Sequence, residues 1–248
     1  MTENAQDRVI AILGAYGGIG SALARLLSQS GYRVVLGGRD PDRLNSLAAE
    51  VDGVAVEVDG REFDQVDRFL STAAAEGPLI GVVNCAGSVL LKPAHLTTRA
   101  DFAETIDANL TTAFAVVRAS AKQLRKQGGS VVLMSSAAAG IGLANHEAIG
   151  AAKAGVAGLV LSAAATYAAR NIRFNAVAPG LVASGATQRI VDNEKALQAS
   201  IRLHPLGRIG QPAEVARLIA WLLDPDNDWM TGQIIQLDGG LASLKVPR

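Results

Sequence analysis

Short apolar runs rich in β-branched residues alternate with longer stretches of helical periodicity along the whole chain. The short runs are almost continuously apolar, which is typical of strands that are buried on both faces of a sheet. Strand and helix patterns follow one another repeatedly, and this order implies right-handed crossovers between parallel strands. The pattern therefore predicts an α/β fold in which helices cover both faces of a doubly wound, seven-stranded parallel sheet.

The strands are expected at residues 8–13, 33–36, 54–58, 80–84, 130–135, 172–178 and 233–237. The helices are expected at residues 18–30, 41–51, 63–75, 99–127, 145–170 and 212–223. No linker rich in Pro, Ser or Gly divides the chain, so residues 1–248 are expected to form a single Rossmann-type domain. Residues 181–205 break the alternation with a helical pattern of their own, which is typical of an insertion that covers a binding site.

Composition excludes several classes of function. The 49% hydrophobic content excludes a disordered scaffold, and the zero net charge without a basic patch argues against binding to nucleic acid or a membrane surface. The one cysteine, Cys85, cannot form an internal disulfide or a zinc site, and no metal is expected. Residues 1–8 are polar and lack the apolar core of a signal peptide, so a cytoplasmic protein is expected.

Residues 151–169 are almost free of charge, which raises the question of whether they form a membrane span. They consist of Ala and Gly with scattered Leu and Val, and they lack the dense run of Leu, Ile and Phe that a span needs. We therefore expect a helix of the core or of a subunit contact.

The first predicted strand ends in a glycine-rich turn, Gly14-Ala15-Tyr16-Gly17-Gly18-Ile19-Gly20, that runs straight into a helix. Such a turn brings backbone N–H groups and a helix N-terminus up to a pyrophosphate, and glycine is needed where a Cβ would collide. A purely structural turn is the alternative. Asn84-Cys85-Ala86-Gly87 and Pro179-Gly180 follow two further strands, so all three segments lie at carboxyl ends of strands, where such sheets bind ligands.

From end to end, the chain resembles the short-chain dehydrogenase/reductase family, and it is similar to the bacterial 3-oxoacyl-(acyl carrier protein) reductases. The resemblance is carried by the glycine turn, Asp59, the Asn84 turn, Asn109, Ser136, Lys153, Asn175 to Gly180, and Asp238-Gly239-Gly240. It implies a nicotinamide cofactor and hydride transfer to or from a carbonyl carbon. It also implies a small-molecule carbonyl or alcohol as substrate, with an acyl-carrier-linked substrate as one option, and a homotetramer or homodimer.

The cofactor contacts that the resemblance implies are Gly14, Tyr16, Gly18, Ile19, Gly20, Arg39, Asp59, Asn84, Ala86, Gly87, Lys153, Pro179, Gly180 and Val182. NAD-preferring relatives carry an acidic residue at the end of the second strand, where this chain has Gly38 followed by Arg39. A guanidinium in place of a carboxylate favours NADP(H), with NAD(H) as the alternative. A surface arginine paired with Asp40 or Asp42 is the other interpretation. Gly17 and Leu13 depart from the family, replacing a basic residue and a threonine respectively.

The active helix of the family carries Tyr-x-x-x-Lys after a serine. Ser136 and Lys153 fit that pattern, but Ile149 stands at the tyrosine position. Isoleucine has no proton to give to an alkoxide, and loss of a positioned general acid typically lowers a rate by about 10²–10⁴. The chain is therefore expected to be an atypical oxidoreductase or, alternatively, a catalytically silent NADP(H)-binding or regulatory protein.

His146 is our hypothesis for a substitute proton donor, acting directly or through water. It precedes Ile149 and Lys153 on roughly the same helical face, and imidazole is suited to proton transfer. The alternative is that His146 packs or caps at the start of the helix. Glu147 is expected to point away from Ile149.

Asn109 is expected to interrupt a long helix, and the resemblance implies that it holds a water in a proton relay with Lys153. A polar residue that only kinks the helix is the alternative. His95 and His204 are expected at the surface. The insertion favours a polar or acyl-carrier substrate because it contains Ser184, Thr187, Gln188, Arg189 and Arg202.

Overall fold

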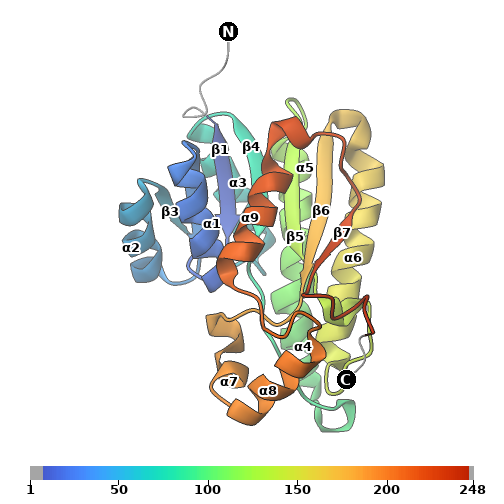
Figure 1. Cartoon of the computed structure of the whole chain (residues 1–248). Helices are drawn as coiled ribbons and strands as arrows, with labels where there is room; N and C mark the ends of the chain where they lie inside the picture. Colours follow the sequence, from blue (N-terminus) through green and yellow to red (C-terminus); the bar gives the residue numbers. More distant parts are fainter. Residues whose placement is uncertain (1–7, 246–248) are drawn as a thin grey trace.

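A computed structural model describes residues 8–245. Seven parallel strands form one sheet in the order β3-β2-β1-β4-β5-β6-β7 (Figure 1). The strands are β1 (Val9–Leu13), β2 (Arg33–Gly38), β3 (Val54–Glu57), β4 (Leu79–Asn84), β5 (Gly129–Met134), β6 (Ile172–Pro179) and β7 (Ile234–Leu237). The predicted α/β fold with a doubly wound, seven-stranded parallel sheet is confirmed. The N-terminal stretch used to argue against a signal peptide lies, up to residue 7, outside the described residues.

Helices cover the sheet in two layers (Figure 1). One layer contains α1 (Gly18–Gln29), α2 (Pro41–Val51) and α9 (Pro212–Leu223), and the other contains α3 (Phe63–Ala75), α5 (Thr112–Gln123) and α6 (Glu147–Tyr167). Because successive residues of a strand point to opposite faces, Ile10 and Ile12 pack against the first layer and Ala11 against the second. Each face therefore has its own apolar core, which explains the continuously apolar strands.

Strand β1 lies between β2 and β4, and the chain winds away from it toward both edges of the sheet. At such a switch point the connections that leave β1 and β4 diverge, and a crevice remains beyond the carboxyl ends of the two strands. The glycine-rich turn follows β1 and the Asn84 turn follows β4, so both motifs lie at this crevice.

Residues 99–127 do not form one uninterrupted α-helix. Helix α4 (Arg99–Ile106) continues into a π-helical turn (Asp107–Thr111) and then into α5, which ends at Gln123. The predicted interruption at Asn109 is confirmed, since Asn109 lies within the π turn. Such turns occur frequently at functional sites. Gly128 and Gly129 both have positive φ and lead the chain into β5, so the helix cannot extend to them.

The helix expected at residues 145–170 begins later, because Asn145 has a left-handed backbone with φ 64°. His146 occupies the N-cap position, α6 runs from Glu147 to Tyr167, and a single 3-10 turn (Ala168–Arg170) follows. The insertion at residues 181–205 contains α7 (Gln188–Val191) and α8 (Glu194–Leu203). Both helices lie beyond the carboxyl ends of the strands (Figure 1).

Among residues 8–245, one helix is long and apolar enough by length and composition alone to cross a membrane, namely Glu147–Arg170. Its most apolar window has a mean hydropathy of 1.6, and 44% of that window is buried inside the fold. Val156, Val160 and Ala163 of this helix pack in the core cluster with residues of β5 and β6. That packing is typical of a core helix, which passes the same test.

Phe69 of α3 anchors the second core layer and is fully buried. We expect Phe69→Ala to lower the free energy of unfolding by about 3–5 kcal/mol, because the truncation leaves a cavity among close-packed side chains. Urea unfolding followed by circular dichroism measures this loss. Phe102→Ala is the matched control, since Phe102 is 46% exposed and should change stability by only about 0.5 kcal/mol. Equal losses in the two variants would contradict the assigned core.

Candidate functional site

The turn after β1 lies directly against the turn after β4. Gly14 has a φ of +76°, and a Cβ at this position would stand 2.5 Å from the backbone nitrogen of Ala86. A Cβ on Gly20 would collide with the carbonyl oxygen of Gly14. Glycine is therefore required at both positions. No side chain caps α1, so the N–H groups of its first turn remain available to an anion.

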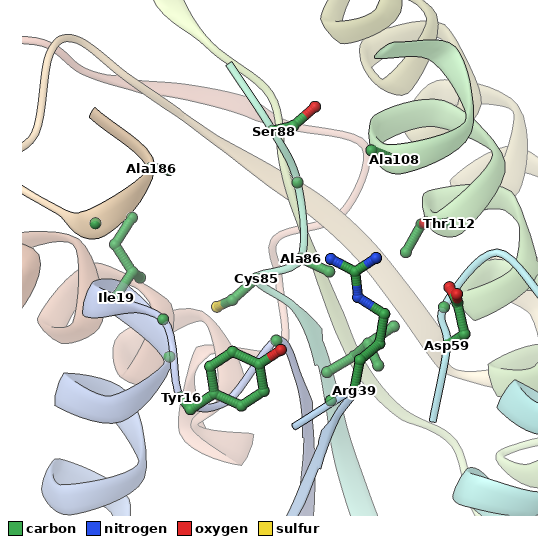
Figure 2. A pocket seen from close by; sticks show the side chains of 18 of the residues that line it. Tyr16, Ile19, Arg39, Asp59, Cys85, Ala86, Ser88, Ala108, Thr112 and Ala186 are labelled. Atoms are coloured by element: carbon green, nitrogen blue, oxygen red, sulfur yellow. The ribbon is translucent and has the colours of Figure 1, made fainter. Parts of the chain in front are cut away.

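A cavity of about 420 Å³, here called the first cavity, lies over this turn (Figure 2). It extends from the end of β2 across the start of α1 to the turn after β4. The predicted cofactor residues that line it are Gly14, Tyr16, Gly18, Ile19, Gly20, Arg39, Asp59, Ala86 and Gly87. Asn84 lines neither this cavity nor the next one described, because its Oδ1 accepts a hydrogen bond from the Ala86 amide at 3.1 Å.

Two arginines face the β2 end of the first cavity. Arg39 extends into it (Figure 2) and forms no hydrogen bond or ion pair within the described chain, so neither Asp40 nor Asp42 pairs with it. Arg43, which sequence analysis missed, lines the same cavity with its guanidinium 4.5 Å from the centroid of the Tyr16 ring. The Asp40 carboxylate instead caps α2 by accepting from the Arg43 amide at 3.1 Å.

Asp59 also lies at this end, and its charge is balanced by Arg61. The guanidinium of Arg61 donates to the two carboxylate oxygens at 3.0 and 2.6 Å, and these bonds lower the pKa of Asp59. Arg61 also contacts Glu104 at 3.2 Å. Arg39 acts on the Asp59 carboxylate through its charge alone, and the guanidinium of Arg43 donates to the Tyr16 carbonyl at 3.2 Å, so both arginines line the cavity without an ion pair to a carboxylate.

A second cavity of about 480 Å³ adjoins the first, and seven residues line both of them: Ile19, Cys85, Ala86, Gly87, Ser88, Ser184 and Ala186. The structure brings all four predicted catalytic residues to the second cavity, together with Ile149, although they come from separate segments. These four are Asn109, Ser136, His146 and Lys153. Pro179, Gly180 and Val182 of the predicted cofactor set line it as well.

Lys153 lies on the buried side of α6, and its Nζ donates a hydrogen bond to the Met134 carbonyl at 2.9 Å. Burial lowers the pKa of Lys153 to about 8, because the ammonium is disfavoured away from water. The hydroxyl of Ser135 donates to the Lys153 carbonyl at 3.0 Å, which ties this turn of α6 to the end of β5. A lysine with this pKa can both bind and release a proton near neutral pH.

Asn109 and Lys153 approach the same point at Gly87. A Cβ on Gly87 would lie 2.8 Å from the Asn109 Oδ1 and 3.5 Å from the Lys153 Nζ. The Asn109 amide donates to the Thr105 carbonyl at 2.9 Å and to the Ser88 carbonyl at 3.2 Å, while its Oδ1 accepts from the Ser88 amide at 3.3 Å. The π turn thus fixes Asn109 against the turn after β4.

Ser136 and His146 lie on the loops that lead to α6. The Ser136 Oγ accepts from the Ala138 amide at 3.2 Å. His146 stands at the N-cap of α6, but its side chain does not cap the helix; its Nδ1 lies 2.8 Å from the Ala144 carbonyl. That contact assigns the proton to Nδ1 in the neutral ring and leaves Nε2 as the second site.

All three tyrosines lie within the described residues, and none of them lines the second cavity. Tyr16 lines the first cavity, while Tyr167 packs against Phe174 with 5.7 Å between the ring centroids. Glu147 accepts a hydrogen bond from the Ala94 amide at 3.4 Å and, as predicted, does not face the cavity.

The prediction that His204 lies at the surface is wrong, whereas His95 is exposed as expected. His204 is 4% exposed and lines the second cavity. Its Nε2 accepts from the Leu181 amide at 3.1 Å and its Nδ1 donates to the Ser200 carbonyl at 2.7 Å. His204 therefore fastens the end of α8 to the chain that leaves β6, a contact between segments that are remote in sequence.

Within residues 8–245, no group of three or more His, Cys, Asp or Glu side chains is placed to hold a metal ion. The polar side chains of the second cavity are hydroxyls, a thiol, an amide, imidazoles and one ammonium. This set can donate hydrogen bonds to an oxygen atom and can transfer protons.

Comparison with known proteins identifies the family. Residues 14–242 match the family model described as enoyl-(acyl carrier protein) reductase. The 3-oxoacyl-(acyl carrier protein) reductase of Thermotoga maritima is 35% identical over 245 residues, covering 95% of this chain and 98% of the relative.

Two solved structures are also similar along nearly their whole lengths. A short-chain type dehydrogenase/reductase from Mycobacterium ulcerans is 30% identical with a TM-score of 0.91, covering 97% of this chain and 91% of that one. A variant of the actinorhodin polyketide ketoreductase, solved with NADPH, is 26% identical with a TM-score of 0.89, covering 98% and 100%. The chain belongs to the short-chain dehydrogenase/reductase family.

Proposed function

We propose that the protein is an NADP(H)-dependent oxidoreductase that interconverts a carbonyl and an alcohol, with Ile149 at the position of the family's catalytic tyrosine. The observation that carries this proposal is the junction of the two cavities at the turn after β4. On one side lies a glycine turn suited to a dinucleotide, and on the other lie Ser136, His146 and Lys153. The similar reductase from Thermotoga maritima and the ketoreductase solved with NADPH support the same reaction class.

The residues of the first cavity fit a dinucleotide phosphate. The close approach at Gly14 and Gly20 leaves the uncapped N–H groups of α1 to receive the pyrophosphate. Arg39 and Arg43 supply guanidinium groups for a 2′-phosphate, and no carboxylate stands at Gly38. When bound, the nicotinamide supplies or accepts the hydride.

The residues of the second cavity handle the oxygen and the proton. Ser136 donates a hydrogen bond to the substrate oxygen, and His146 gives the proton to the alkoxide directly or through one water. The side chains of Lys153 and Asn109 approach each other at Gly87. There they contact the bound cofactor and form part of a proton relay. An imidazole suits this role because its ring nitrogens can both donate and accept a proton.

The cofactor assignment predicts that Arg39→Gln and Arg43→Gln weaken NADPH binding and leave NADH binding almost unchanged. Each lost charge-assisted hydrogen bond contributes about 1.5–3 kcal/mol, so the Kd for NADPH should rise about 10- to 100-fold. Fluorescence titration with each nucleotide measures the two constants. Arg25→Gln is the control, since Arg25 pairs with Glu50 outside the first cavity. Equal weakening of both nucleotides would count against a 2′-phosphate site.

The proton-donor assignment predicts that His146→Ala lowers the rate of NADPH oxidation on a carbonyl panel by about 10²–10⁴. Ile149→Tyr should restore a rate in that background, because it returns a phenol next to Lys153. His95→Ala is the matched control, since His95 is exposed and outside both cavities. Full activity in His146→Ala would remove His146 from the proposed mechanism.

Ile149 also favours a second candidate function, a catalytically silent NADP(H)-binding or regulatory protein. The buried isoleucine removes the proton donor without removing either cavity. This candidate replaces the first if the protein binds NADPH, stays inactive on the whole panel, and becomes active only as Ile149→Tyr.

The proposed proton-holding role of Lys153 has a consequence for stability. Folding lowers the pKa of this lysine to about 8 from a reference near 10.4, so the unfolded chain binds more protons between these pH values. From pH 8 to pH 10.5, the free energy of unfolding should therefore rise by about 1–3 kcal/mol more in the native protein than in the Lys153→Met variant.

Urea unfolding of both proteins at several pH values measures this difference, in which other titrating groups cancel. Lys195→Met on the exposed side of α8 should show no such trend. A difference that is independent of pH would mean that Lys153 keeps its proton throughout this range.

The same family membership supports two further proposals, a homodimer or homotetramer and a cytoplasmic location. Phe114 of α5 and Leu161 of α6 are 49% and 56% exposed, which is consistent with a helix-to-helix contact between subunits.

A further inference from the structure

The walls of the second cavity are mostly apolar. On the side of the β4 turn and the loop before α6, they are formed by Val89, Leu91, Leu143 and Ile149. Ile190 of α7 and residues of α8 line the same cavity. A pocket of this size and lining holds a ligand mainly by burying its apolar surface, with a few polar groups to orient it.

One face of helix α8 lines the cavity. Ala196, Ala199 and Leu203 line the cavity and lie three or four residues apart, so they form one mainly apolar stripe along the helix. Ser200 is the polar residue of this face that also lines the cavity.

The cationic residues of the insertion, Arg189 and Arg202, do not line the cavity. Of the side chains that favoured a polar substrate in the sequence, the hydroxyls of Ser184 and Thr187 line the cavity. Gln188 and the two arginines do not.

Large apolar side chains stay exposed around the same cavity. Val89 is 42% exposed, Leu91 is 41% exposed and Leu203 is 46% exposed, and all three are lining residues. Burial of such side chains is normally favourable, at about 25 cal/mol for each Å² removed from water. A ligand with an apolar body would cover them in a way that the folded chain alone does not.

Among the described residues, no Asp, Glu or Arg lines the second cavity, and Lys153 is its only ammonium. That ammonium already donates to the Met134 carbonyl and approaches Gly87 and Asn109 on the cofactor side. Apart from His146, which is assigned to give its proton to the alkoxide, the cavity thus offers no free cation to a carboxylate or phosphate group on the substrate, and such a group would lose its hydration on entering.

We propose that the substrate is a free, uncharged and mainly apolar ketone or secondary alcohol, whose body packs between the Val89–Leu91 wall and the apolar stripe of α8. The proposal rests on the oxidoreductase function proposed above and names its substrate class. Uncharged polar groups, Ser200 and Thr187 among them, also line the cavity, and of its polar groups Ser136 and His146 are assigned to orient the single oxygen. Ile149 belongs to the apolar wall.

The test compares three probes that each carry a ketone: the methyl ketone 2-octanone, its carboxylate counterpart 7-oxooctanoate, and a 3-oxooctanoyl thioester on acyl carrier protein. Calorimetric titration into the full chain, with and without saturating NADP⁺, measures binding without turnover, because the oxidised cofactor has no hydride to transfer. We expect 2-octanone to bind at least about 10-fold more tightly than 7-oxooctanoate, as a buried, unpaired charge is costly. Tighter binding of the carboxylate, or binding of the carrier-borne probe alone, would overturn the proposal.

Variants locate the effect in the cavity. Leu203→Arg introduces a cation at the apolar stripe and should shift the ratio of the two dissociation constants toward 7-oxooctanoate by about 10-fold. Leu206→Arg places the same charge on a leucine that is 70% exposed and does not line the second cavity, so the ratio should stay unchanged. Arg189→Ala should also leave it unchanged. A selective loss of 7-oxooctanoate binding in Arg189→Ala would show that Arg189 binds the charged group of the substrate, which would contradict the proposal.

Parallel assays of NADPH oxidation separate this proposal from the proposed function. Selective binding of 2-octanone without turnover would sustain the substrate class and reject the oxidoreductase. Turnover that prefers 7-oxooctanoate or the carrier-borne thioester would sustain the oxidoreductase and reject the substrate class.

Discussion

The approach of the β1 end to the β4 turn is the constraint on which the rest of the site depends. The Cys85 amide donates to the Leu13 carbonyl at 2.8 Å, and Gly14 then passes so close to Ala86 that no side chain fits between them. This contact closes the space directly over the two strands and leaves room on either side. The first cavity occupies the side of β2, and the second occupies the side of β5 and α6.

A second constraint follows from the same packing, because the turn after β4 is also pressed against Asn109 and Lys153 at Gly87. The π turn is what turns the Asn109 amide toward Ser88, and burial within α6 is what lowers the pKa of Lys153. An ammonium in such a place destabilises the fold unless it has partners, and within the described chain its hydrogen-bond acceptor is the Met134 carbonyl. Its position at the junction of the two cavities favours a role with a bound molecule over a role in packing.

The sequence predicts the sheet well because strands buried on both faces must be apolar throughout, and this leaves an unambiguous pattern. Ser136 and Lys153 were found because they match the pattern of the family that the chain resembles, and both line the second cavity. The start of α6 was misplaced because periodicity carries no signal for the left-handed backbone of Asn145. Arg43, Arg61 and His204 were missed because their partners, Tyr16, Asp59 and Leu181, are identified by three-dimensional contact and by no motif.

Isoleucine at position 149 bears on the proposed reaction in two ways. Its side chain has no hydroxyl to donate a proton, and, at the tyrosine position proposed for it, it would add apolar surface where an alkoxide forms, so that negative charge there would be more costly. Delivery of the proton is therefore the step on which any reduction depends. Lys153 is buried, whereas His146 is half-buried on the loop before α6. Solvent therefore reaches the imidazole more easily than the ammonium, which supports the proposal that His146 acts as the acid.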